Sequence, residues 1–203
     1  MLSLALVLAY FVGCGGSRSG STGPPASQAI EKPAAAPAAA TRPSPAPGSG
    51  AQSEPDVPLI DEKDLARALE GLRGKVVLVD FWATWCGACV ENFPHTVALY
   101  RQLGPQGLAV IAVSMDEPED APHVRKFLAG QGAGFLNFQS KLGGSSDEAI
   151  ARFQIRDGTL PHLRLYDRAG KLRHTFPSKE AGKLEPEAIE HAVRELLEEP
   201  DTQ

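Results

Sequence analysis

Cysteine is scarce in this chain of 203 residues, which contains three. A small secreted scaffold held together by disulfides needs more cysteines and a smaller body, so the core must come from apolar packing. Cationic clusters are also missing: the net charge is -5 at pH 7, and no run of lysine and arginine indicates a nucleic-acid or anionic membrane surface. No apolar stretch reaches the roughly 20 residues that cross a bilayer.

The first 14 residues have the composition of an export signal. Residues 2–12 are apolar, too short to span a bilayer but suited to the core of a signal peptide. The sequence FVGC at residues 11–14 resembles a bacterial lipobox, in which the cysteine is lipidated and becomes the new N-terminus. We therefore expect a signal peptide over residues 1–14, lipidation of Cys14 and an extracytoplasmic location. A signal peptide cut near Gly13–Gly16, with Cys14 incidental, is the alternative.

Low-complexity sequence follows the export signal. Residues 15–58 are rich in Ser, Gly, Pro and Ala, a composition that cannot bury enough apolar surface to offset the entropy of ordering. They predict a disordered tether between a membrane anchor and a folded domain at residues 59–198, with residues 199–203 as a C-terminal tail. The remaining chain of roughly 150 residues is long enough for one domain with its own core.

Strand and helix patterns alternate along the folded part. The β-branched run at residues 76–79 is typical of a strand buried on both faces, and residues 108–113 repeat the pattern. Further strands are predicted at residues 135–138, 162–166 and 171–176, and helices at 61–72, 86–103, 118–130, 147–153 and from 186 onward. The order is βαβ, then an αβ insert, then ββα, which predicts an α/β fold with a mixed central sheet and helices on both faces.

The motif WCGAC at residues 85–89 follows the first buried strand at once. Two cysteines separated by two residues can close a small disulfide. A helix that starts at Cys86 presents free backbone N–H groups and the positive end of its dipole, which stabilise a thiolate there. In such motifs a thiol pKa falls from about 8.5 to roughly 3.5–7.5. Because this thiolate attacks disulfides at neutral pH, the motif predicts dithiol–disulfide exchange.

Two segments resemble a known family. Residues 79–89, VDFWATWCGAC, resemble the active-site segment of thioredoxins, and residues 161–172 resemble the later hairpin of the TlpA/ResA branch. The resemblance covers residues 57–197. It implies a thioredoxin fold with an αβ insert and membership of a group of membrane-tethered, extracytoplasmic thiol–disulfide oxidoreductases. It also implies that Cys86 is the exposed nucleophile and Cys89 the buried resolving thiol.

The resemblance assigns roles to four further residues. Asp80 matches a buried carboxylate that accepts a proton from Cys89 through water, with a strand-end cap as the alternative. Pro161 matches a cis-proline that faces the cysteines and leaves the main chain of Leu160 free to pair with an extended substrate. An ordinary trans turn is the alternative for Pro161. Trp85 is expected to be an apolar contact surface for the substrate.

Three neighbouring positions depart from the family pattern or stay open. Ala112 occupies the position at which thioredoxin places a lysine near the carboxylate. His162, directly after Pro161, could reach the thiols or be a plain strand residue. Trp82 is expected to pack locally.

Other function classes stay open beside exchange. A zinc site needs a second cysteine pair, and the sequence has none, but two thiolates with His162 could bind or deliver copper. A thiol peroxidase of the redoxin group is a further alternative, although Ala83 stands where peroxiredoxins carry a threonine. A non-enzymatic tethered binding domain would have little need of both thiols. We expect a monomeric reductant without cofactor or bound metal, whose partners are cysteine-containing extracytoplasmic proteins and a membrane electron donor, with no nucleic acid.

Overall fold

The computed structural model describes residues 55–144, 146–155, 158–177 and 184–200, all of them within the compact unit Ser49–Gln203. The expected signal peptide, Cys14 and most of the expected tether lie outside the described residues, as do residues 156–157 of the loop before Leu160. Val57 is buried in the core, and the Pro58 carbonyl accepts a hydrogen bond from the Gln139 N–H at 3.1 Å. The packed structure therefore includes these two residues at the end of the expected tether.

Each helix and strand predicted from the sequence is present, with small shifts at the ends. The strands are β1 (Leu59–Ile60), β2 (Val76–Trp82), β3 (Leu108–Ser114), β4 (Leu136–Ser140), β5 (His162–Tyr166) and β6 (Leu172–Pro177). The helices are α1 (Glu62–Glu70), α2 (Gly87–Leu103), α3 (Ala121–Gln131), α4 (Asp147–Arg152) and α5 (Pro186–Glu198), with short 3-10 turns at Gly104–Gln106 and Pro118–Asp120. The two-residue strand β1 was not predicted.

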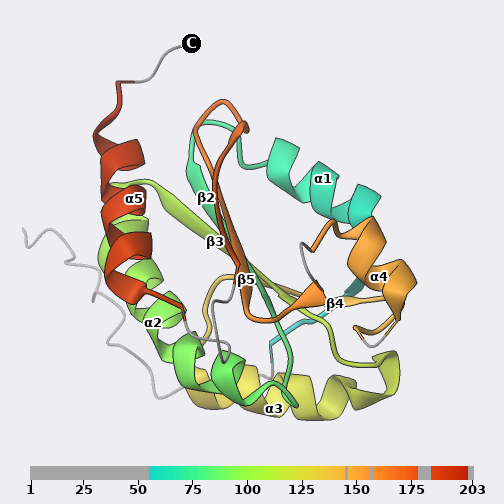
Figure 1. The fold of residues 1–203 in the computed structure, drawn as a ribbon. Coiled ribbons are helices and arrows are strands. Elements are labelled where there is room, and N and C mark those ends of the chain that lie inside the picture. The colour runs from blue at the N-terminus through green and yellow to red at the C-terminus, as the bar shows by residue number, and fades with distance from the viewer. Residues whose placement is uncertain (1–54, 145, 156–157, 178–183, 201–203) are drawn as a thin grey trace, which may run out of the picture. The chain divides into compact units, whose positions relative to one another are not determined.

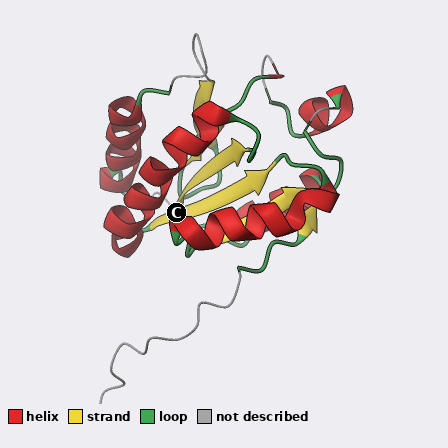
Figure 2. Cartoon of the chain, turned by 90° about the horizontal axis from the view of Figure 1, so that it is seen from below, coloured by secondary structure: helices red, strands yellow, loops and turns green. Residues whose placement is uncertain are grey.

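The strands form one mixed sheet in the order β1-β4-β3-β2-β5-β6. The pairs β1–β4, β4–β3 and β3–β2 are parallel, whereas β2–β5 and β5–β6 are antiparallel. Helices α2 and α5 lie on one side of the sheet and α1 and α4 on the other (Figure 1). Seen from below, the strands lie between helices (Figure 2). This arrangement confirms the α/β thioredoxin fold, and the insert adds β4 between β1 and β3.

Strand β2 is the centre of the core and delivers the cysteines to the sheet edge. All seven of its residues are buried. Val76 and Leu78 pack in the cluster that contains Leu196 of α5, whereas Val79 and Phe81 pack in the cluster on the other side. Such two-sided burial is the reason why the strand reads as a continuous apolar run. The chain leaves its carboxyl end and enters α2 within five residues.

Candidate active site

Cys86 and Cys89 form a disulfide at the start of α2. The two Cα atoms lie 5.2 Å apart, and the S–S distance is 2.11 Å. Cys86 is the N-cap residue of the helix, and its Sγ accepts a hydrogen bond from the Cys89 N–H at 3.2 Å. A sulfur held at this position meets the unpaired N–H groups and the positive dipole end that stabilise a thiolate after reduction.

The two cysteine residues differ in their exposure to solvent. Cys86 is 9% exposed and Cys89 is 2% exposed, so the order follows the expectation for a nucleophile and a resolving thiol. Cys86 is nevertheless far less exposed than the sequence led us to expect. The reason is local: its sulfur is bonded to that of the buried Cys89.

The two tryptophans of the segment have opposite environments. Trp85, directly before the disulfide, is 58% exposed and offers a broad apolar surface beside it. Trp82 is buried, and its ring centroid lies 4.8 Å from that of Phe93 and 4.7 Å from that of Phe127. Trp82 therefore packs locally, as predicted, whereas more than half of the Trp85 surface is open to solvent.

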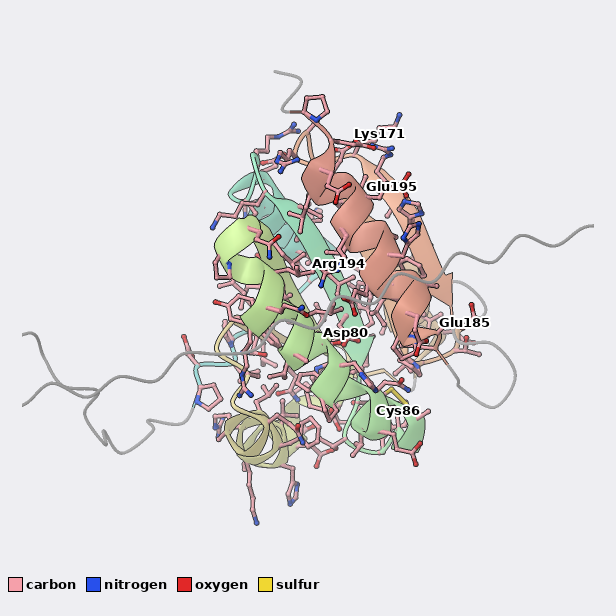
Figure 3. All side chains as sticks on the ribbon, turned by 90° about the vertical axis from the view of Figure 1, so that its left-hand side faces the viewer. Asp80, Cys86, Lys171, Glu185, Arg194 and Glu195 are labelled. Carbon is pink, nitrogen blue, oxygen red and sulfur yellow. A yellow bond between two sulfur atoms is a disulfide. The ribbon has the colours of Figure 1, made fainter. Side chains whose placement is uncertain are left out.

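Asp80 is a buried acid in the middle of β2, with only 3% of its surface exposed. Its Oδ2 accepts a hydrogen bond from the Thr96 hydroxyl of α2 at 2.7 Å. This contact crosses from sheet to helix, so the strand-end cap interpretation does not describe it. Burial raises the pKa of Asp80 to about 6, partly opposed by the Thr96 hydrogen bond. Figure 3 shows Asp80 on the strand behind α2 and Cys86 at the start of that helix.

The segment before β5 contains the cis peptide bond that the sequence predicted. The Leu160–Pro161 bond is cis, so a trans turn is not present. Leu160 is half-buried and Pro161 is buried. The His162 side chain is fully buried, and its ring centroid lies 6.0 Å from that of Phe81, its partner in the β2–β5 register. These contacts agree with the interpretation of His162 as a strand residue.

Sequence reasoning missed an acid that holds the loop before the cysteines. Asp116 is fully buried and accepts the Thr84 N–H at 3.1 Å and 3.0 Å on its two oxygens. It also accepts hydrogen bonds from the Thr84 and Ser114 hydroxyls. A signal for this contact exists in the register: Trp82 pairs with Ser114, so the residues two positions beyond each strand end, Thr84 and Asp116, fall at the same sheet edge.

The described residues contain neither a metal-binding cluster nor a membrane-spanning helix. Within ranges 55–144, 146–155, 158–177 and 184–200, no three His, Cys, Asp or Glu side chains are grouped closely enough to hold a metal ion. In the same ranges, no helix has the length and apolar character needed to cross a membrane.

Comparisons with known proteins agree with this geometry. Residues 51–175 match the model of the AhpC/TSA family. The thiol-disulfide oxidoreductase ResA of Geobacillus kaustophilus is 29% identical over 70% of this chain and 75% of its own length. ResA of Geobacillus thermodenitrificans is 31% identical over 59% of this chain and 64% of its own length, so the match leaves part of both relatives uncovered. A solved structure described as the thiol:disulfide interchange protein DsbE from Chlorobium tepidum has a TM-score of 0.52 and 28% identity, over 64% of this chain and 84% of that one.

Proposed function

Because the chain belongs to the AhpC/TSA family and is a thiol–disulfide oxidoreductase similar to ResA, we propose that it reduces disulfides of extracytoplasmic proteins through Cys86 and Cys89. The observation that carries the proposal is the disulfide-bonded cysteine pair at the start of α2, in which Cys86 is more exposed than Cys89. A pair placed in this way can pass two electrons to a partner and return to the disulfide that the structure contains.

The exchange proceeds in two substitutions at sulfur. The Cys86 thiolate attacks one sulfur of the partner disulfide, which forms a mixed disulfide and releases the other partner sulfur as a thiolate. Cys89 then loses its proton and attacks the Cys86 sulfur, so that the bond to the partner breaks and the Cys86–Cys89 disulfide forms. The partner gains two electrons and, after protonation, two thiols; the protein loses two electrons.

Asp80 is proposed as the acceptor of the Cys89 proton, through water. A carboxyl with a pKa of about 6 is largely ionised at neutral pH yet binds a proton more readily than an ordinary aspartate. Its burial on β2, the strand that leads into the cysteine loop, supports this role. The raised pKa therefore suits a group that accepts and returns a proton once in each cycle.

The partner is proposed to bind across Trp85 and Leu160. The exposed ring of Trp85 offers apolar surface, and the cis Leu160–Pro161 bond precedes strand β5. An extended partner segment would pair with the main chain of Leu160 as an added strand. In contrast, the peroxidase alternative draws no support from Ala83, because its methyl group provides no hydroxyl beside Cys86.

An extracytoplasmic, lipid-anchored location is proposed from the N-terminal sequence, in which the apolar residues 2–12 precede Cys14. The tether expected from residue 15 onward would then give the domain reach from the membrane. Incorporation of labelled palmitate in cells should be lost in a Cys14→Ser variant. Unchanged labelling of that variant would contradict the anchor.

The Cys89→Ala variant tests the exchange function. Without the resolving thiol, mixed disulfides between Cys86 and its partners should accumulate, because the second substitution cannot occur. Partners would be identified after non-reducing electrophoresis of cells that express the variant. A Cys86→Ser, Cys89→Ala double variant is the matched control and should trap none. Equal recovery of partners with both variants, or with neither, would contradict exchange through this pair.

A further inference from the structure

We propose that Thr96 is a positioning residue for Asp80 and thereby sets the pH range in which Cys89 resolves a mixed disulfide. The inference rests on the proposed function, since it concerns the second substitution of the exchange. It also concerns a residue of α2 that lies two turns beyond Cys89 and outside the cysteine motif.

The contact between Thr96 and Asp80 is short and shielded from water. The Thr96 hydroxyl donates to Asp80 Oδ2 at 2.7 Å, and both side chains are buried. Among the described residues, the other carboxylate oxygen, Oδ1, has no hydrogen-bond partner. One donor therefore orients the carboxylate by one oxygen, and the second oxygen stays available to receive a proton.

The strands that flank Asp80 provide no substitute for this donor. Asp80 pairs with Ala112 of β3 and with Leu163 of β5, and neither side chain has a polar atom. Ala112 occupies the position at which the sequence resemblance places a lysine in thioredoxins. In the present chain a neutral hydroxyl from the helix is thus the polar neighbour of the carboxylate, in place of a cation from the sheet.

The elements around Asp80 carry several charged and titratable groups, and none of them contributes to its pKa shift. Helix α2 carries the two cysteines, which form the disulfide, and the exposed Glu91 and His95; the start of α5 carries the exposed Glu185 and Glu187. On β5, His162 and Arg164 flank Leu163 and pack on the Phe81 side of the sheet. Asp116, which follows β3, accepts a hydrogen bond from the Thr84 N–H. Burial and the Thr96 hydrogen bond are the causes of the pKa shift of Asp80, and no charged residue contributes.

The direction of the Thr96 effect follows from the donor. A hydroxyl that donates to a carboxylate stabilises the ionised form, so it lowers the pKa of Asp80 against the larger effect of burial. Hydrogen bonds to charged groups are strong enough to shift a pKa by about one to two units. Without the hydroxyl, Asp80 would stay protonated to a higher pH and could not accept the Cys89 proton in the neutral range.

The test measures the second substitution alone, in the reduced full-length chain. Every variant also carries Cys14→Ser, so that Cys86 and Cys89 are the only thiols. Dithionitrobenzoate reacts first with Cys86, in a step whose rate depends on reagent concentration. Attack by Cys89 then releases a second coloured thiolate at a rate independent of that concentration. Stopped-flow absorbance from pH 5 to pH 9 gives the pH profile of this second phase.

Thr96→Val keeps the shape of the side chain and removes the donor, and Thr96→Ser keeps the donor. We expect the half-rise of the second phase to move up by about one to two pH units in Thr96→Val. It should stay near the wild-type position in Thr96→Ser. In an Asp80→Asn background the rise due to Asp80 should be absent, and the added Thr96→Val change should have no further effect on the profile.

Two results would overturn the inference while leaving exchange intact: superimposable profiles of Thr96→Val and wild type, or an equal shift by Thr96→Val in the Asp80→Asn background. A wild-type protein that shows no second phase at any pH would instead overturn the proposed function itself. Circular dichroism of each variant at each pH separates these outcomes from unfolding.

Discussion

Thr84 links the loop that carries the cysteines to a buried acid on the neighbouring strand. Its N–H and its hydroxyl both donate to Asp116, whose second oxygen also accepts from Ser114. These hydrogen bonds join the three residues to one another and do not involve a sulfur atom. Their effect is to hold the backbone between β2 and α2, so that Trp85 and Cys86 keep their places at the sheet edge.

Replacement of Thr84 by valine should destabilise the protein by about 1–2 kcal/mol, because it leaves the buried carboxyl group of Asp116 without this hydrogen bond. Thr84→Ser retains the hydroxyl and is the matched control. The free energy of unfolding in urea, measured on the oxidised proteins, provides the comparison. No loss in Thr84→Val, or a loss in Thr84→Ser as large as that in Thr84→Val, would contradict this role of the hydroxyl.

At this scale the sequence predicted the residues with distinctive chemistry and missed those that support them. Cys86, Cys89 and the cis bond at Pro161 were predicted because spacing and family resemblance mark them directly. Thr96 and Asp116 have no local signal, since each is paired with a residue 16 or 32 positions away. Such pairs become visible only when strand register and helix packing are known.

Among the helices, α5 depends on a side chain from the hairpin between β5 and β6. Arg168 donates hydrogen bonds at 2.9 Å to the carbonyls of Leu196, Leu197 and Glu199 at the end of the helix. A cation at this position pairs with carbonyls that lack partners within the helix. It also interacts favourably with the negative end of the helix dipole. The hairpin turn thus fixes the end of α5, which covers the side of the sheet that contains Val76 and Leu78.

Arg168→Ala should therefore lower the free energy of unfolding by about 1–3 kcal/mol, with little effect on the exchange rate of the folded protein. The nearby Arg173→Ala variant serves as control, since Arg173 makes exposed ion pairs with Asp167 and Glu199 and should contribute much less. Urea unfolding with a parallel exchange assay separates stability from activity. A larger loss in Arg173→Ala would contradict this account of the helix end.

Whole elements were easier to predict than their ends. The long apolar runs of β2 and β3 and the periodic helices α2 and α5 each have enough residues for the pattern to stand out. Strand β1 has two residues and is defined by pairing with β4, so nothing within it distinguishes it from the preceding segment. The helix predicted from residue 118 begins as a 3-10 turn and becomes α-helical only at Ala121.

For the molecule as a whole, the buried Asp80 makes stability depend on pH. Its pKa is raised from 3.8 to about 6, so the folded state binds the proton more tightly than the unfolded chain does. The contribution of Asp80 to the free energy of unfolding is therefore greatest below pH 4. It falls as pH rises through 6, by roughly 3 kcal/mol in total. Above that range both states are ionised and the loss is complete.

Asp80→Asn removes this titration and should stabilise the oxidised protein relative to wild type at pH 7.5, with a difference that shrinks toward pH 4. Urea unfolding at five pH values between 4 and 8 gives the difference directly. Glu119→Gln, a change at an exposed acid, is the control for general effects of charge removal. A difference between Asp80→Asn and wild type that stays constant with pH would rule out the raised pKa.

The reduction potential of the Cys86–Cys89 pair tests the central claim most directly. It is obtained by equilibration of the full-length Cys14→Ser protein with glutathione buffers, followed by quantification of its free thiols. A reductant of extracytoplasmic disulfides should show one two-electron transition near about -270 mV, the range of thioredoxin. A value near about -120 mV would contradict the reductant role and indicate a disulfide donor. Failure of the pair to form a disulfide in any buffer would contradict exchange itself.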